Sequence, residues 1–311
     1  MGCHIGSHFV GALAYADDLV LLAPSANAMR RMLQVCDDYA AQYNVLFNAT
    51  KSKCLCCHSV GTPKYGLKFV NCQPFYIGSK AIEFVERWPH LGHIISNDCD
   101  DADDILSKKL TFIGQANKVL YNFRHVDCIT KTKLVNAYCT SFYGPELWDL
   151  SHRDIESVCT AWRKGLRRIW QLPRATHSVL LPRLSNTVPI FDMFYKRMLN
   201  FVHRCLTSDS SLVSSIMRQA ILHGQANSII GRNVINCCLR YHVTIDAIMT
   251  SSFRHYHIDK FLTQTDASAA IADWLTELLL CRDRVLHLSG GDFGEDDLRV
   301  MIDLLCVSPI T

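Results

Sequence analysis

Two adjacent aspartates interrupt an apolar run near the amino end of the chain. Asp17 and Asp18 lie between the mostly apolar segments 9–15 and 19–23. A buried carboxylate is costly without a partner, and two neighbouring carboxylates each raise the cost of ionising the other. The pattern therefore predicts two short strands joined by a tight turn, with Asp17 and Asp18 at the tip of a β-hairpin.

Paired carboxylates become favourable when a divalent cation neutralises them. Mg²⁺ prefers carboxylate oxygens, keeps several waters and completes its shell with phosphate oxygens. Asp17 and Asp18 are therefore candidate Mg²⁺ ligands for phosphoryl transfer. The alternative is a solvated Asp-Asp turn that holds no metal.

Composition limits the remaining possibilities. The 311 residues leave room for about two domains, and a chain that is 49% hydrophobic and 20% charged is expected to fold. The formal charge of +3 means that any nucleic-acid contact must come from local basic patches. No apolar stretch reaches the roughly 18–20 residues of a membrane span, and the amino end has neither a signal-peptide nor a myristoylation pattern. We therefore expect an intracellular protein, nuclear or cytoplasmic, with no membrane partner.

The fifteen cysteines are scattered along the chain. Without a secretory signal we interpret them as reduced thiols that mostly fill the core. The one cluster, residues 54–58, contains a C-x-x-C pattern, but a zinc site needs a second pair and the nearest candidate is Cys72 alone. Alternation along a short strand explains the cluster equally well.

The chain changes character after Asn97, from strand-rich to helical. Five aspartates between positions 98 and 104 predict a helix start rather than a metal site, because acidic residues favour the positive end of a helix. Asp104 and Lys108 form an i,i+4 pair in that helix. The sequence thus predicts an α+β protein. Strands are expected at 44–47, 53–57, 66–70, 75–77, 81–85 and around 90–95, and helices at 28–43 (capped by Ser25), 131–143, 155–170, 190–206, 212–222 and 267–281.

The predicted helix 155–170 has an apolar stripe that contains Trp162 and Trp170, which we interpret as core residues. The cations Arg163, Lys164, Arg167 and Arg168 are expected on the other side. Such a face could bind phosphates. A solvated charged face is the alternative.

Four segments together resemble the reverse transcriptases of LINE-type retrotransposons, which lack long terminal repeats. Tyr15-Ala16-Asp17-Asp18 resembles their signature hairpin, and residues 48–53 resemble the Asn-x-x-Lys-[Ser/Thr]-Lys segment that follows. Residues 88–95 resemble the primer grip. Residues 141–148 and 162–173 resemble the thumb.

This resemblance implies a partial palm at 1–97, a helical thumb at 98–189, and a helical region of unknown role at 190–311. It implies RNA-directed DNA polymerase chemistry with Mg²⁺ on Asp17 and Asp18, and a role for Lys51 near the incoming nucleotide, for which a solvent-exposed turn lysine is the alternative. Template and primer, or an RNA–DNA hybrid, would contact Tyr15, Leu91, Gly92 and the four cations.

One departure from the family pattern changes the expected activity. These palms hold their metals with a further aspartate upstream of the hairpin, whereas the fourteen residues before Tyr15 contain neither Asp nor Glu. The fingers and endonuclease are not recognised either. We therefore expect the C-terminal part of a reverse transcriptase, from a truncated element or an incomplete gene model, inactive or nearly so alone. The alternatives are a non-catalytic nucleic-acid-binding module and a helical interaction protein.

Overall fold

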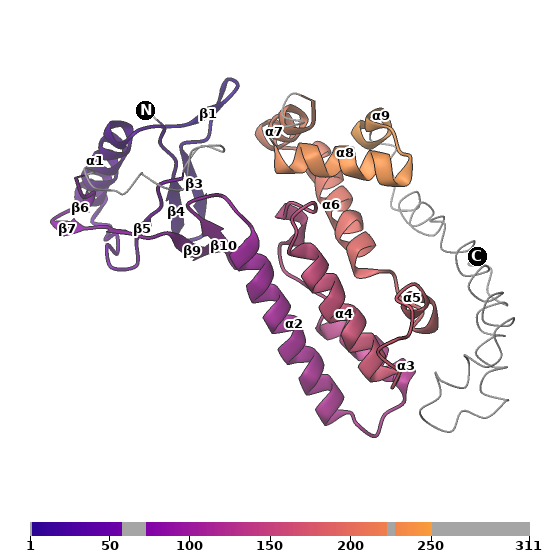
Figure 1. The fold of residues 1–311 in the computed structure, drawn as a ribbon. Coiled ribbons are helices and arrows are strands. Elements are labelled where there is room, and N and C mark those ends of the chain that lie inside the picture. Colours follow the sequence, from indigo (N-terminus) through magenta and orange to yellow (C-terminus); the bar gives the residue numbers. More distant parts are fainter. Residues whose placement is uncertain (1, 58–72, 223–227, 251–311) are drawn as a thin grey trace, which may run out of the picture. The chain divides into compact units, whose positions relative to one another are not determined.

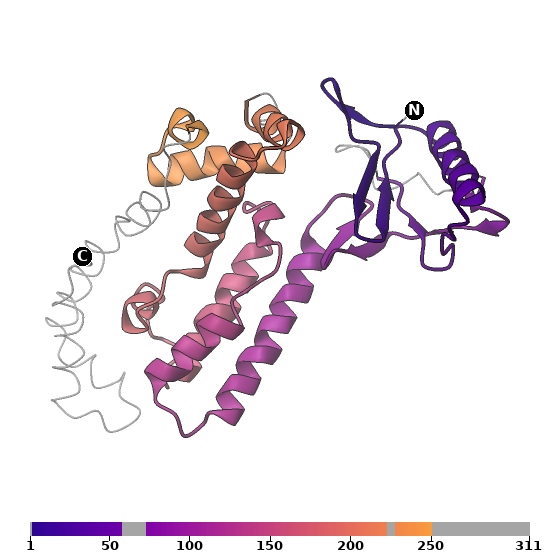
Figure 2. The same ribbon diagram turned by 180° about the vertical axis from the view of Figure 1, so that it is seen from behind.

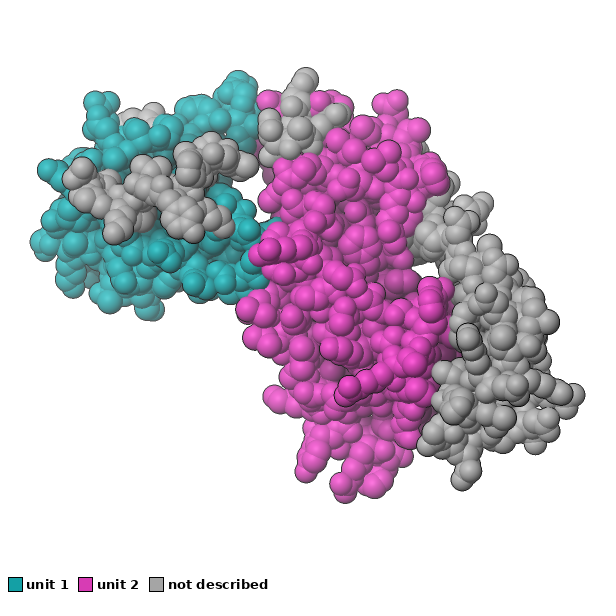
Figure 3. Space-filling view, viewed as in Figure 1, with its two compact units in different colours: residues 1–103 teal, residues 104–311 magenta. Residues whose placement is uncertain are grey.

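The computed structural model describes residues 2–57, 73–222 and 228–250. The chain divides into two compact units, residues 1–103 and 104–311, which are described separately here (Figures 1 and 3). Short strand pairs occupy the first unit and helices fill the second, which confirms the α+β prediction. The first boundary lies six residues beyond the expected one. No boundary falls at residue 189, because helix α6 packs against the preceding elements.

Unit 1 is built from short strand pairs and one long helix. Strands β3 and β4 pair antiparallel with Tyr15 opposite Asp18, so the predicted Asp hairpin is confirmed. Ser25 caps α1, as predicted, by accepting a hydrogen bond from the Ala28 amide at 3.2 Å. The elements are β1 (His4–Ile5), β2 (His8–Phe9), β3 (Ala12–Tyr15), β4 (Asp18–Leu21), α1 (Ala26–Tyr43), β5 (Lys53–Cys54), β6 (Tyr76–Ile77), β7 (Lys80–Ala81), β8 (Glu83–Phe84), β9 (Arg87–His90) and β10 (His93–Ser96).

Two strand predictions in unit 1 are wrong. Residues 44–47 form no strand, because Asn44 takes a left-handed conformation that ends α1. The expected strand around 90–95 is instead a hairpin, since Leu91 and Gly92 both have positive φ and reverse the chain between β9 and β10. The expected strand 66–70 lies outside the described residues.

A small core holds unit 1 together. Leu33 of α1 packs with Phe75 and Ile82, and Leu21 brings the end of β4 to the same cluster. Most of the β3–β4 hairpin is exposed, including Tyr15 with 66% of its surface accessible. The hairpin is thus anchored at its base while its tip is open to solvent.

Unit 2 is a bundle of helices (Figures 1 and 2). The predicted helix 190–206 matches α6 at both ends, and 155–170 matches α4 to within one residue. Helix 131–143 begins and ends earlier than expected, and 267–281 lies outside the described residues. The elements are α2 (Ala102–Asn122), α3 (Cys128–Tyr138), η1 (Pro145–Leu147), α4 (Ile155–Ile169), α5 (Leu180–Leu184), α6 (Ile190–Leu206), α7 (Ser211–Leu222), α8 (Ile229–Tyr241) and α9 (Ile245–Met249).

The acidic run does start a helix, as predicted, but its last member has a second role. The Asp100 carboxylate accepts a hydrogen bond from the Ala102 amide at 2.7 Å, at the beginning of α2. Asp104 is fully buried, and its Oδ2 accepts a hydrogen bond from the Trp148 indole at 2.7 Å. Lys108 lies 3.4 Å from the same carboxylate, so the predicted i,i+4 pair is confirmed and partly buried.

Trp148 stands at the centre of the core of unit 2. Its ring packs edge-to-face against Phe194 of α6 and Phe142. The buried Asn233 of α8 donates a hydrogen bond to the Trp148 carbonyl at 2.7 Å and accepts one from the Leu150 amide at 2.9 Å. One short segment therefore ties α2, α6 and α8 together.

Replacing Asp104 with alanine should destabilise unit 2 by about 1–3 kcal/mol, because the Trp148 indole would keep a buried donor without an acceptor. Urea unfolding followed by circular dichroism at 222 nm measures this change, since helices dominate the unit. Asp103→Ala is the matched control. Asp103 pairs with Arg87 at the surface, so its loss should cost no more than about 1 kcal/mol. Equal effects of the two changes would contradict the role of Asp104.

Candidate functional site

The hairpin turn presents both aspartates to solvent. Ala16 and Asp17 form the two-residue turn, and Asp18 is the first residue of β4. Ala16 has a φ of 52°, a left-handed value at the position where type II′ turns favour glycine. Among the described residues, no hydrogen bond or ion pair engages either carboxylate.

These two carboxylates fit part of an Mg²⁺ site. They are adjacent, exposed and free to accept a cation, and hard carboxylate oxygens are the ligands that Mg²⁺ prefers. Within the described part of the chain, however, no group of three or more Asp, Glu, His or Cys side chains converges on a possible metal position. Asp17 and Asp18 thus supply two ligands, and water or phosphate oxygens would have to supply the rest.

Lys51 and Lys53 of the segment 48–53 have different surroundings. Lys51 is exposed in a turn that Asn48 closes, since the Asn48 Oδ1 accepts the Lys51 amide at 3.1 Å. Lys53 instead reaches Glu83 at 2.5 Å and lies over the Trp88 ring. Lys53 therefore ties β5 to β8, while Lys51 remains available for a ligand.

Leu91 and Gly92 form the tip of the β9–β10 hairpin. Both residues have left-handed φ values, 48° and 76°, and the Leu91 side chain is exposed. The structure therefore presents these predicted contact residues at a second turn rather than along a strand.

The cysteine cluster gains a member that is distant in sequence. The Cys57 thiol is hydrogen-bonded to Cys99, and burial together with Cys99 and Cys56 raises the pKa of Cys57 to about 11. A thiol with so high a pKa is protonated at neutral pH and a poor nucleophile. His58 and Cys72 lie outside the described residues.

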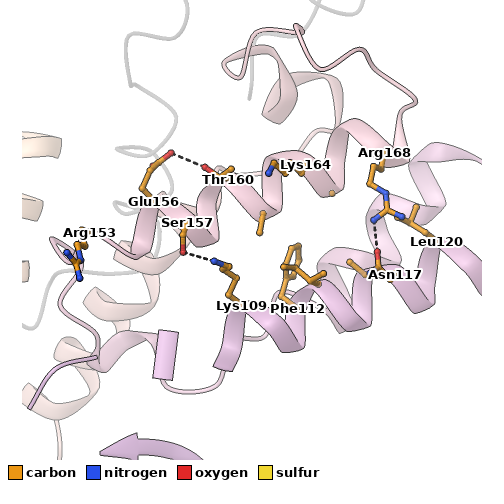
Figure 4. Close-up of a pocket in the computed structure, with 14 residues that line it drawn as sticks. Lys109, Phe112, Asn117, Leu120, Arg153, Glu156, Ser157, Thr160, Lys164 and Arg168 are labelled. Atoms are coloured by element: carbon orange, nitrogen blue, oxygen red, sulfur yellow. Dashed lines mark hydrogen bonds between the residues drawn. The ribbon is translucent and has the colours of Figure 1, made fainter. Parts of the chain in front are cut away.

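A groove runs between α2 and α4 in unit 2, with a volume of about 530 Å³ (Figure 4). Its floor is apolar and includes small residues of both helices. Its rim carries cations from both helices and from the turn before α4. The lining residues are Lys109, Phe112, Ile113, Ala116, Asn117, Leu120, Arg153, Glu156, Ser157, Thr160, Ala161, Lys164, Gly165 and Arg168.

The four predicted cations of α4 lie in two rows rather than on one free face. Lys164 and Arg168 are exposed on the rim of the groove. Arg163 pairs with Glu156. Arg167 donates hydrogen bonds to the Thr176 carbonyl at 2.9 Å and to the Ser178 hydroxyl at 3.1 Å.

Arg167 therefore holds the loop that follows α4. Its partial burial and the neighbouring Arg163 lower the pKa of its guanidinium below the usual value, which remains far above neutrality, so the charge is retained. We predicted that the four cations of α4 form one free face. This is wrong for Arg167, because its guanidinium is bonded to Thr176 and Ser178 of the loop.

Lys109 and Arg153 were not predicted from the sequence. Lys109 belongs to α2, and its ammonium donates to the Ser157 hydroxyl of α4 at 3.3 Å (Figure 4). Arg153 precedes α4 in a turn. Only the packing of α2 against α4 brings these cations to the same groove as Lys164 and Arg168. Trp162 belongs to the core, as predicted, and Trp170 is partly buried and packs against that core.

Comparison with known proteins gives one distant similarity. A segment of 112 residues, 34% of this chain, is 30% identical to the retrovirus-related Pol polyprotein from type-2 retrotransposable element R2DM of Drosophila melanogaster. That similarity indicates a retrotransposon-related origin. The aligned segment covers only 10% of that polyprotein. No family model and no solved structure matches the chain.

No helix in the described residues is both long and apolar enough to cross a bilayer.

Replacing Arg167 with alanine should loosen the loop 173–178. Loss of its two hydrogen bonds removes about 1 kcal/mol of local stability, so trypsin should cleave after Arg174 about fivefold faster or more. Limited proteolysis with mass spectrometry measures this rate. Lys164→Ala serves as the control, because Lys164 is exposed and makes no hydrogen bond or ion pair with the described residues. An unchanged cleavage rate in the Arg167 variant would contradict the anchoring role.

Proposed function

We propose that this chain is the palm-to-thumb part of a LINE-type reverse transcriptase, an RNA-directed DNA polymerase. The observation that carries the proposal is the hairpin tip, where two adjacent carboxylates face solvent without a partner among the described residues. The similarity to a retrotransposon Pol polyprotein supports it.

In this proposal Asp17 and Asp18 hold Mg²⁺ through carboxylate oxygens. When bound, the cation neutralises phosphate oxygens and supports nucleotidyl transfer to a primer end. The rigid hairpin fixes the direction of both carboxylates, and Tyr15, at the end of β3, contacts the primer–template beside them. Lys51 contributes a positive charge toward the incoming nucleotide, and Leu91 with Gly92 contacts the primer.

In this proposal, cationic side chains of unit 2 bind the sugar–phosphate backbone of an RNA–DNA hybrid. Lys164 and Arg168 are exposed and make no ion pair with the described residues, so they can neutralise phosphates without first breaking an ion pair. Phosphate contacts of this kind carry affinity without reading sequence.

A second candidate is a non-catalytic nucleic-acid-binding module. The described residues bring together two metal-ligating side chains rather than three or more, which favours weak metal binding by this chain alone. In that case Asp17 and Asp18 would be vestigial, while the cations of unit 2 would still bind nucleic acid.

Fe²⁺ in place of Mg²⁺ should cut the protein backbone near residues 15–19. With ascorbate and peroxide, bound Fe²⁺ generates hydroxyl radicals that cleave the nearest chain. We expect cleavage in the presence of an RNA–DNA hybrid and a deoxynucleotide, because phosphate oxygens complete the metal shell. Excess Mg²⁺ should suppress it. Mass spectrometry locates the cut.

The variants Asp17→Asn and Asp18→Asn should each abolish this cleavage while the chain stays folded. Asp38→Asn is the control, since Asp38 is an exposed acid of α1 bonded to Gln34. Cleavage that persists in the Asp17 and Asp18 variants would refute metal binding at the hairpin and favour the non-catalytic module. We expect no primer extension by residues 1–311 alone.

Replacing Lys164 and Arg168 together with alanine should weaken hybrid binding at every sequence. The logarithmic salt dependence should become shallower by about 1.4–1.8, for roughly 0.7–0.9 per lost phosphate contact. Fluorescence anisotropy at several salt concentrations measures both quantities. The double variant Lys118→Ala and Lys133→Ala removes the same charge from exposed positions outside the groove and should leave the slope unchanged. If both double variants show the same salt dependence of binding, the cations of α4 form a solvated surface that does not contact the hybrid.

A further inference from the structure

The groove between α2 and α4 has a shape that phosphate binding alone does not require. Its floor is formed by apolar side chains such as Ile113 and Leu120. The small residues Ala116, Ala161 and Gly165 leave the space between the helices open. A volume of about 530 Å³ lies within the range of cavities that enclose small organic ligands.

The rim of the groove has a charge excess. Lys109, Arg153, Lys164 and Arg168 contribute four cations, and none makes an ion pair with the described residues. The one acidic residue of the lining, Glu156, already pairs with Arg163. The groove is therefore suited to an anionic ligand that also carries an apolar surface.

Polar groups lie between the cations and the floor. The Asn117 side-chain Oδ1 accepts a hydrogen bond from Arg168 at 2.5 Å, and the Ser157 hydroxyl accepts one from Lys109 at 3.3 Å (Figure 4). The Ser157 hydroxyl itself donates to the Asp154 carbonyl at 2.6 Å, whereas the Asn117 side-chain NH₂ keeps its donors for a ligand. A side-chain amide beside an apolar floor matches the edge and the face of a nucleobase.

We propose that this groove binds one unpaired nucleotide next to an RNA–DNA hybrid, with its phosphates on the cationic rim and its base on the apolar floor. The inference rests on the proposed hybrid binding and deepens it. Paired bases are stacked inside a duplex, so a duplex can reach only the rim, whereas an unpaired base can enter the groove. An acidic amphipathic helix is the competing occupant, but the polar groups within the groove suit it less well.

The groove can be filled without changing its charge. A Cβ at Gly165 would lie 3.7 Å from the Phe112 ring, an ordinary van der Waals distance, so Gly165→Ala should fold normally. The Ala161 side chain is partly exposed in the groove, so Ala161→Leu would occupy the floor. The double variant Ala161→Leu with Gly165→Ala, called the filled variant, tests whether a base occupies the floor. The double variant Lys164→Ala with Arg168→Ala, called the charge variant, tests whether the rim contacts phosphates.

The experiment compares a blunt RNA–DNA hybrid with the same hybrid carrying an unpaired overhang. We expect the parent chain to bind the overhang form about fivefold more tightly or better, as for one well-placed base. The filled variant should lose this preference and keep its affinity for the blunt hybrid to within about twofold. The charge variant should weaken binding to both forms. A 5-bromouridine in the overhang should cross-link to residues 109–120 or 153–168.

The outcomes separate this inference from the proposed function. Binding of both hybrids without a preference overturns the nucleotide site and leaves hybrid binding intact, whereas no binding to either refutes both. A preference that survives in a folded filled variant, or a cross-link elsewhere, also overturns the site. If the double variant fails to fold, Gly165→Ala alone should reduce the preference. If the parent chain shows no preference for the overhang, and an acidic amphipathic peptide binds the parent but not the filled variant, the groove is a binding site for a protein partner and the nucleotide site is overturned.

Discussion

The hydrogen bond from the Trp148 indole to the Asp104 carboxylate determines how unit 2 is assembled. Both side chains are fully buried, so neither can exchange its partner for water, and the bond is strong because the acceptor is charged. Asn233 fixes the backbone from the Trp148 carbonyl to the Leu150 amide. The amino-terminal halves of α2, α6 and α8 therefore meet at one residue. The wall of the groove that α2 supplies is held by this contact.

The same contact places two aromatic residues of segment 141–148 in the core of unit 2. The sequence predicted a thumb motif here, and Phe142 and Trp148 of this segment serve as core residues that pack edge-to-face against Phe194. A recognisable pattern can therefore reflect packing rather than ligand binding. The cations show the converse, since Lys109 and Arg153 belong to no sequence pattern but reach the groove through the packing of two helices.

Sequence reasoning succeeded where a local pattern decides the structure. The Asp hairpin, the Ser25 cap and helices α4 and α6 each follow from the spacing of apolar residues and from cap or turn chemistry. It failed where backbone conformation or distant packing decides. Left-handed Leu91 turned an expected strand into a hairpin, and the loop at Thr176 and Ser178 occupied Arg167. The burial of Asp104 depends on a tryptophan 44 residues away, which no helical pattern can reveal.

The left-handed alanine at the hairpin tip has an energetic consequence. For an L-amino acid this conformation costs about 1–2 kcal/mol, whereas glycine adopts it readily. Glycine at position 16 would therefore relieve the strain at the turn. With alanine the turn is strained, and this cost falls on the segment that presents Asp17 and Asp18 to solvent.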